Sequence, residues 1–481
     1  MRGLTDLDFD NTYARLDPAF YQVVDPTPLT DPRLVAFNPD AARLIDLDPA
    51  AASDPDAAIY LSGGRRLPGA EPIAAIYAGH QFGVWVPQLG DGRAILLGEA
   101  KNGRGERWDL QLKGAGMTRF SRMGDGRAVL RSTIREYLAS IALEGLGIPT
   151  TRALAIVASD DPVYRETPET AATLIRMAPT HVRFGTFQLF ASRGQHQRVA
   201  ELADYVIGWF DPDLAGRPDR YERWLERTAN RTADLIAHWT AAGFAHGVMN
   251  TDNMSILGLT LDYGPYGFLD EYDPGFVCNH SDHDGRYAFD RQPAVGLWNL
   301  ARLAEALLQF LTEDAANEAL GRYPARFAAT YAGLMRARLG LRTEEAEDAT
   351  LIGELLEMMA AARADYHRTL RTLAEDPDPL RSLVLDLDRK RAWLDRYRER
   401  VNREGRPDAE RRSAMVAASP KYVLRNYLAQ EAIDRAGTRD YSGIDTLVRL
   451  LREPFAEHAG FERYAEPSPP SAKDLIVSCS S

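Results

Sequence analysis

The apolar residues of this sequence change their spacing along the chain, and this change narrows the choice of fold more than any other feature. Between residues 73 and 113 they form short runs broken by glycine, at 84–86, 94–97 and 108–113. Runs of this length, bounded by glycine, are typical of β-strands joined by tight turns. The segment is therefore predicted to form a meandering antiparallel sheet.

A helical pattern replaces the strand pattern over residues 128–144. Apolar residues at 130, 134, 138 and 141 form one stripe, and Gly145 is the first of several residues that end it. Glu136 lies off that stripe, on a second row with Val129 and Leu143. The helix is therefore expected to pack on two sides.

The second half of the chain is mainly helical. A β-type run at 172–177 precedes it, and its helices include 226–242 and 295–311. A sheet with one helix, followed mostly by helices, predicts an α+β fold. The order is that of a bilobal protein-kinase-like fold, with an N-lobe of antiparallel sheet plus one helix and a mainly helical C-lobe. We expect an N-terminal extension and N-lobe at 1–190, the C-lobe at 191–462, and a flexible tail with Cys479 at 463–481.

Composition excludes several classes of protein. The chain has a formal net charge of −12, whereas binding a nucleic-acid backbone requires a basic surface. Its N-terminus lacks the basic start and apolar run of a signal peptide, and no apolar stretch is long enough to span a bilayer. The two cysteines, Cys278 and Cys479, are too few for a disulfide framework or a cysteine-based zinc site. We therefore expect a cytoplasmic protein that binds neither nucleic acid nor membranes.

The segment from His246 to Asn253 resembles the catalytic loop of protein kinases. It keeps the spacing of the motif H-R-D-x-x-x-x-N, and Asp-Tyr-Gly at 262–264 stands where kinases have their metal-binding Asp-Phe-Gly. The amide oxygen of Asn253 and a carboxylate from the second motif are suitable ligands for Mg²⁺ on a triphosphate. The position of the kinase base holds Val248, however, and a carboxylate occurs instead at Asp252.

This displaced carboxylate has two interpretations. Asn and Asp favour turns, so residues 246–253 could form only a polar turn after a helix that ends at Gly243. Alternatively, the acceptor hydroxyl approaches from a direction other than the one used in kinases, beside Asp252.

Two glycine turns precede this loop, at 88–94 and 123–127, and both contain Gly-Asp-Gly-Arg. Glycines let backbone N–H groups approach a phosphate closely, and arginine adds charged donors. Each turn alone is also a common hairpin sequence. Lys113 and Glu136 follow in the order of the lysine–glutamate pair of kinases, although alone they would be an ordinary surface lysine and helix glutamate.

Arg176 and Arg183 flank a turn at 178–181 and could converge with Lys113 on a polyphosphate. Three cations around the terminal phosphates would bury them and leave the α-phosphorus as the accessible electrophile. The same cations would stabilise the charge that grows on departing pyrophosphate. This arrangement predicts nucleotidyl transfer, unless the arginines pair with surface carboxylates instead.

Two other segments have simpler interpretations. His and Asp side chains at 279–287 could bind a transition metal, but ligands so close in sequence would need an unusual loop to face one ion. Basic residues at 389–403 are mixed with carboxylates at helical spacing, which predicts a solvated helix face rather than a nucleic-acid-binding patch.

Several motifs of the chain closely resemble those of the SelO (YdiU) family of protein adenylyltransferases, which look like pseudokinases. The resemblance covers nearly the whole chain, and its most specific parts lie at 77–83, 87–94, 110–116, 121–128, 250–255 and 262–265. It implies a protein nucleotidyltransferase that moves AMP from ATP, or UMP from UTP, to Ser, Thr or Tyr hydroxyls of other proteins. An unorthodox kinase that transfers the γ-phosphate and a non-catalytic nucleotide-binding scaffold are the alternatives.

The same resemblance implies roles for individual residues. ATP would lie inverted relative to its pose in kinases, with Glu136 orienting Lys113. Asp252 would be the proton acceptor, and Asn253 and Asp262 would bind Mg²⁺ or Mn²⁺. The residues implied to contact ATP are Gly90, Gly92, Arg93, Lys113, Asp125, Gly126, Arg176, Arg183 and Asp262.

Eukaryotic members of the family carry selenocysteine near the C-terminus, and Cys479 occupies the corresponding place. Ser478 precedes it, which argues against a disulfide within the tail. A redox-sensitive bridge between Cys479 and Cys278 is a further hypothesis.

Overall fold

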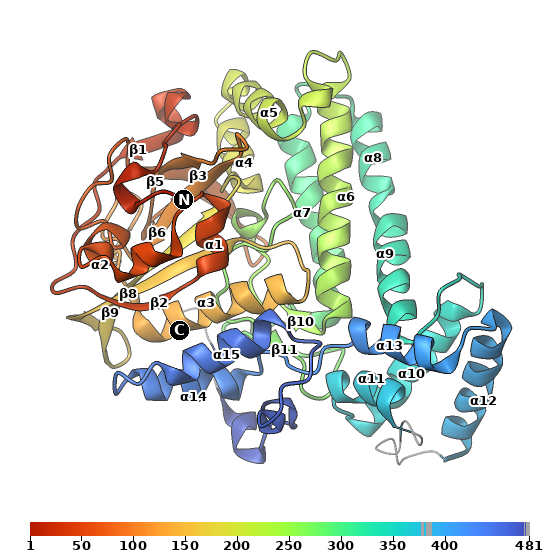
Figure 1. The fold of residues 1–481 in the computed structure, drawn as a ribbon. Helices are drawn as coiled ribbons and strands as arrows, with labels where there is room; N and C mark the ends of the chain where they lie inside the picture. The colour runs from red at the N-terminus through yellow and green to blue at the C-terminus, as the bar shows by residue number, and fades with distance from the viewer. Residues whose placement is uncertain (377–379, 381–386, 476, 478–481) are drawn as a thin grey trace.

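The computed structural model describes all residues except 377–379, 381–386, 476 and 478–481. A large β-sheet with short helices occupies one side of the molecule, and long helices occupy the other (Figure 1). The predicted α+β class is therefore confirmed. Cys479 lies outside the described residues, so its bridge to Cys278 stays a hypothesis.

The main sheet has nine strands in the order β1-β3-β5-β6-β9-β8-β2, with β4 paired to β3 and β7 paired to β9. Every pairing is antiparallel. The strands are β1 (Tyr21–Val23), β2 (Arg33–Phe37), β3 (Ile73–Gln81), β4 (Val84–Gly90), β5 (Ala94–Lys101), β6 (Arg107–Lys113), β7 (Ala128–Val129), β8 (Arg152–Tyr164) and β9 (Pro168–Ala178).

The predicted sheet at 73–113 is confirmed, but its strands do not follow one another as a simple meander. Strand β1 pairs with β3 along residues 73–75, and β4 pairs with the rest of β3 along 76–81. Strand β5 then pairs with β3 at Ile73. The reason is that β4 and β5 both run antiparallel to β3 and pair with successive stretches of it, so the chain does not reverse between them. Strand β1, from the N-terminal extension, pairs with β3 on the edge opposite β5.

The two faces of the sheet pack against different layers, because successive side chains of a strand point to opposite faces. Leu112 and Ile175 pack toward α1 (Pro39–Leu44) and α2 (Ala57–Leu61) in one core. Leu174, their neighbour on β9, packs with α3 (Leu130–Gly145) in another. Lys113 is the register partner of Leu174 and therefore shares the face that α3 covers.

Helix α3 begins at Leu130 and not at residue 128 as predicted, because Ala128 and Val129 pair with β9 as strand β7. It is buried between the sheet and the C-terminal helices α14 (Asn426–Ala436) and α15 (Ser442–Arg452), as Figure 1 shows. The expectation that it packs on two sides is confirmed.

The helical half is built around α6, whose 22 residues pack against α7, α8 and α9. Helix α6 begins earlier than the predicted residue 226, and α7 ends earlier than the predicted residue 311. The remaining elements are α4 (Phe184–Ser192), α5 (His196–Phe210), α6 (Arg220–Ala241), β10 (Phe244–Ala245), β11 (Gly267–Phe268), α7 (Gln292–Leu307), α8 (Glu313–Gly321), α9 (Tyr323–Arg338), α10 (Asp348–Ala362), α11 (Tyr366–Glu375), α12 (Leu387–Glu404) and α13 (Asp408–Ala418).

The basic run at 389–403 lies on α12, where Arg396 pairs with Glu354 and Arg403 with Glu345. The prediction of a charged helix face is confirmed. In the part of the chain that is described, no helix combines the length and apolar character that crossing a bilayer requires.

The described part of the C-terminal tail contacts the helical half. Ser468 Oγ donates to Asp270 Oδ1 at 2.6 Å, and His280 N donates to the carbonyl oxygen of Val477 at 3.1 Å. The second contact places the tail beside the loop that follows Cys278.

Candidate active site

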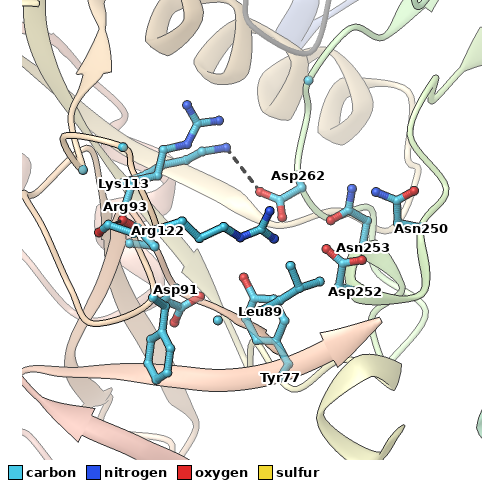
Figure 2. A pocket seen from close by; sticks show the side chains of 18 of the residues that line it. Tyr77, Leu89, Asp91, Arg93, Lys113, Arg122, Asn250, Asp252, Asn253 and Asp262 are labelled. Carbon is cyan, nitrogen blue, oxygen red and sulfur yellow. Dashed lines mark hydrogen bonds and ion pairs between the residues drawn. The ribbon is translucent and has the colours of Figure 1, made fainter. Parts of the chain in front are cut away.

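A cleft of about 570 Å³ lies between the sheet and the loops of the helical half. Figure 2 shows Lys113 of β6, with Arg93 and Arg122 from the loops beside the sheet, opposite Asp252 and Asp262. The cleft brings together these residues of the predicted site: Gly90, Gly92, Arg93, Lys113, Asp125, Gly126, Arg176, Arg183, Asp252, Asn253 and Asp262. Glu136 lies behind this surface, in contact with Lys113.

Three cations converge on the carboxylate of Asp262. Its Oδ1 lies 3.2 Å from Lys113 Nζ and 3.0 Å from Arg176 Nη1. Its Oδ2 lies 3.4 Å from Arg183 Nη1. The predicted convergence of these three cations is therefore present in the fold, and Asp262 is the anion between them.

Glu136 of α3 holds two of these cations from behind. Its Oε1 accepts hydrogen bonds from Lys113 Nζ and, at 2.7 Å, from Arg176 Nη2. Strand register explains why the two cations are neighbours: Gln111 opposes Arg176 and Lys113 opposes Leu174, so the cations are diagonal partners on one face. The side chain of Glu136 is 4% exposed, so this carboxylate is a buried counter-charge.

The cluster is electrostatically coupled. Burial disfavours the ionised form of Asp262, but the charges of Lys113, Arg176 and Arg183 outweigh it and hold the pKa of that carboxyl well below its usual value. Burial lowers the pKa of Lys113, and Glu136 and Asp262 oppose that change. Three cations face two carboxylates here, which leaves a surplus of positive charge for an anionic ligand.

His246 fixes the loop that resembles a kinase catalytic loop. Burial lowers the pKa of His246, which favours a neutral ring. Its Nε2 donates to the carbonyl oxygen of Leu261 at 3.0 Å, and its Nδ1 accepts from Val248 N at 3.3 Å. The loop is thereby tied to the residue before Asp262, so it is more than a solvated polar turn.

Asn253 and Asp262 offer oxygens to the cleft from two adjacent segments. Asn253 Nδ2 donates to the carbonyl oxygen of Val248 at 3.0 Å, which leaves its Oδ1 as the free acceptor. An amide oxygen and a carboxylate are the oxygen donors that Mg²⁺ and Mn²⁺ prefer. The two residues therefore fit the predicted metal site.

Asp252 directly precedes Asn253 in the same loop and is only 6% exposed. Its Oδ2 accepts from Gln81 Nε2 at 3.4 Å, whereas its buried Oδ1 has no hydrogen-bond partner. Gly79 permits this placement, because a Cβ there would lie 2.7 Å from that Oδ1. Burial raises the pKa of Asp252 to about 6, a value suited to a base near neutral pH.

The two predicted glycine turns form one wall of the cleft. Ser121 Oγ donates to the carbonyl oxygen of Gly92 and so joins the first turn to the second. Gly126 has φ 70°, and a Cβ there would lie 2.1 Å from the carbonyl oxygen of Gly116. Only glycine fits this position, which keeps the second turn close to the sheet.

Asp125 has a partner that the sequence did not indicate. Its carboxylate forms a two-pronged pair with Arg165, at 2.8 and 2.9 Å, and this pairing lowers the pKa of Asp125. Within the described part of the chain, the side chains of Arg93 and Arg122 make no hydrogen bond or ion pair. No role was predicted from the sequence for Arg122 or Arg165. Arg122 lies in the segment 121–128 that carries the family resemblance, but no contact is implied for it there, and Arg165 is a lone arginine in a turn that gives no signal by itself.

The alternative metal centre at 279–287 is not formed. No group of three His, Cys, Asp or Glu side chains able to hold a metal ion occurs among the described residues. Asp282 accepts instead from the backbone N–H groups of Arg286 and Tyr287, at 2.9 and 2.7 Å. The segment is therefore a loop ordered by its own aspartate.

These observations define the class of the protein: an α+β protein whose cationic cleft can hold a polyphosphate beside a metal-competent Asn–Asp pair and a separate buried carboxylate. Residues 3–452 match the family model described as protein adenylyltransferase SelO. The chain is 55% identical to the protein nucleotidyltransferase YdiU of Myxococcus xanthus and 56% identical to that of Thioalkalivibrio sulfidiphilus, with all of each chain covered. It is 53% identical to that of Thiobacillus denitrificans over the same full coverage. The chain belongs to the SelO family.

Proposed function

We propose that this protein transfers AMP from ATP to Ser, Thr or Tyr hydroxyls of other proteins and releases pyrophosphate. One observation carries the proposal: Lys113, Arg176 and Arg183 meet at one point of the cleft, while Asp252 lines the cleft outside this cluster and forms no ion pair with the three cations. Cations at that point suit the β- and γ-phosphates, and a base outside the cluster suits an acceptor at the α-phosphorus.

The other expected contacts support this orientation of ATP. Gly90, Gly92 and Gly126 line the wall where backbone N–H groups can approach a phosphate, and Arg93 adds a cation without a protein partner. Asp125 lines the same wall, and we assign it to nucleotide binding together with its partner Arg165. Asn253 and Asp262 would hold Mg²⁺ or Mn²⁺, which when bound would neutralise charge on the phosphate oxygens.

The transfer requires one proton acceptor. Asp252 takes the proton of the acceptor hydroxyl as its oxygen bonds to the α-phosphorus. The bond from that phosphorus to the bridging oxygen of the β-phosphate breaks, and pyrophosphate leaves with its electron pair toward Lys113, Arg176 and Arg183. Glu136 keeps Lys113 and Arg176 in place during this step.

We further propose that the fold is a bilobal, protein-kinase-like one. The N-terminal extension and N-lobe would comprise residues 1–190, the C-lobe 191–462 and the tail 463–481. The lysine on β6, the glutamate on α3 and the Asp-Tyr-Gly motif at 262–264 have the mutual contacts of their kinase counterparts.

A kinase that transfers the γ-phosphate is the second candidate. Val248 occupies the position of the kinase base and lines the cleft, so a hydroxyl placed there would have no proton acceptor. The orientation of the nucleotide thus distinguishes the two functions. Either ATP or UTP could be the donor, because the contacts proposed above involve the phosphates.

ATP labelled at the α-phosphate or at the γ-phosphate tests the proposal. We expect protein to acquire label from α-³²P-ATP and not from γ-³²P-ATP, in the presence of Mg²⁺ or Mn²⁺. Asp252→Asn should lose the α-label while still binding ATP. The opposite labelling pattern would establish a kinase. If neither the α-label nor the γ-label appears in protein, a nucleotide-binding scaffold would remain.

A further inference from the structure

A second groove adjoins the nucleotide cleft on the side of Asp252. It has a volume of about 610 Å³, and Phe82 lines both the groove and the cleft. Its other walls include Trp298 of α7 and the loop that carries His283 and Arg286. A ligand in this groove would therefore lie next to the proposed base.

The hairpin between β3 and β4 connects the two sites. Gln81 pairs with Val84, so Phe82 and Gly83 form a two-residue turn. Gln81 Nε2 contacts Asp252 Oδ2 at 3.4 Å, and the next side chain, Phe82, lies 37% exposed over Tyr287 with ring centroids 5.3 Å apart. The hairpin thus places Gln81 beside the proposed base, Asp252, and the next residue, Phe82, in the groove.

Phe82 is an unexpected residue for this turn. Its φ is 51°, a left-handed conformation that Asn, Asp or Gly adopt with less strain than a bulky side chain. Asn250 Oδ1 and Tyr287 Oη lie 3.1 and 2.9 Å from Phe82 N and hold it in place. A strained and exposed aromatic residue that is held this firmly indicates a contact role.

Two arginines, Arg291 and Arg286, bring positive charge to the groove, and Arg286 is the one that lies against Trp298. Its guanidinium stacks over Trp298 at 4.6 Å from the ring centroid, and it forms no ion pair with any carboxylate that the structure describes. Its Nε is buried without a hydrogen-bond partner. The two carboxylates that line the groove, Asp282 and Asp284, do not neutralise it, and Asp282 is already engaged by backbone N–H groups.

We infer that this groove binds the acceptor polypeptide of the transfer reaction, with a carboxylate side chain against Arg286 and an apolar side chain against Phe82 and Trp298. The inference rests on the proposed function, because only a transferase needs an acceptor beside Asp252. It is supported by continuity with the nucleotide cleft and by Arg286, which forms no ion pair with a carboxylate in the described part of the chain. The favoured substrates are thus segments with Glu or Asp near the modified hydroxyl.

Two random copolymers test this preference, one of Glu and Tyr and one of Lys and Tyr. The wild-type protein should modify the Glu–Tyr copolymer with a KM about tenfold or more below that for Lys–Tyr, as a charge-assisted contact predicts. The net charge of −12 favours the Lys–Tyr copolymer at long range, so such a preference must come from a local site.

Arg286→Gln should raise the KM for Glu–Tyr about tenfold and leave the affinity for ATP unchanged, whereas Arg286→Lys should retain part of the preference. Arg302→Gln is the matched control, because Arg302 stacks on the same Trp298 ring at 5.1 Å but does not line the groove. Equal effects of Arg286→Gln and Arg302→Gln, or no preference in the wild type, would overturn the inference.

Binding of fluorescein-labelled Glu–Tyr copolymer, followed by anisotropy without ATP, separates this inference from the proposed function. If no acceptor takes α-label, the proposed function fails, and anisotropy still reports whether the groove binds acidic polypeptide through Arg286. If transfer occurs but Arg286→Gln binds the copolymer as tightly as the wild type, the inference is wrong and the function stands.

Discussion

Arg176 and Asp262 form an ion pair of 3.0 Å between Nη1 and Oδ1, although 86 positions separate them in the sequence. The side chain of Arg176 is 2% exposed, whereas that of Asp262 is 27% exposed and faces the cleft. The aspartate can therefore exchange this partner for a metal ion, while the arginine stays in place to meet a phosphate. The carboxylate of Asp262 thus occupies the position between the cations where we expect an anionic ligand to bind.

Asp262→Asn tests this exchange. Removing the carboxylate leaves three cations without their shared partner, so metal-free ATP should bind about tenfold more tightly than to the wild type. Transfer of α-label should fall at least about 100-fold, because a proposed metal ligand is lost. Isothermal titration with ATP in EDTA and α-label incorporation measure the two effects. Weaker binding of metal-free ATP would contradict the exchange.

Glu136→Gln should destabilise the protein strongly. Glu136 is the buried counter-charge of Lys113 and Arg176, and breaking such a pair costs about 3–5 kcal/mol of unfolding free energy. Glu169→Gln is the control, because its partner Arg131 is 29% exposed and such a pair contributes about 0–1 kcal/mol. Urea denaturation compares the two variants. Similar midpoints would show that Glu136 is not the counter-charge we assign.

The activity should depend on pH through Asp252. Burial raises the pKa of this carboxyl to about 6, and only the deprotonated form accepts a proton. The logarithm of kcat/KM should therefore rise with pH below about 6 and level off above it. In Asp252→Asn, kcat should fall by about 10²–10⁴-fold and the rise should vanish. A profile of the wild type that is flat between pH 5 and 7 would rule out this base.

Arg122→Ala should weaken ATP binding without affecting the fold. In the described part of the chain the Arg122 side chain has no hydrogen-bond or ion-pair partner, and it lines the cleft beside the glycine turn. Loss of one phosphate contact should raise the KM for ATP about tenfold or more, with the melting temperature unchanged. Arg119→Ala, in the same loop but outside the cleft lining, should leave the KM unchanged. Equal changes in both variants would argue for a general effect of loop charge.

Much of the fold could be predicted from the sequence, because strand and helix patterns reflect contacts between near neighbours in the chain. The strands at 73–113, the helix at 128–144 and the later helices were found within a few residues of their observed bounds. The differences are of three kinds: β8 was not predicted, β5 pairs with β3 where a meander would pair it with β4, and element ends shift. At Ala128 and Val129, for example, pairing with a distant strand replaces the first turn of a helix. The local spacing of apolar residues does not indicate which distant strand a segment pairs with.

The chemical types in the site were also readable from the sequence, because Lys113, Glu136, Asp252, Asn253 and Asp262 stand in motifs with fixed spacing. The contacts that build the site and the groove could not be read from the sequence. These contacts join segments that are 40 or more positions apart: Arg165 pairs with Asp125, Gln81 contacts Asp252, and Phe82 shares a groove with the loop that carries Arg286. Only packing of the sheet against the helical half brings such residues together, and burial in that packing sets their charges and pKa values.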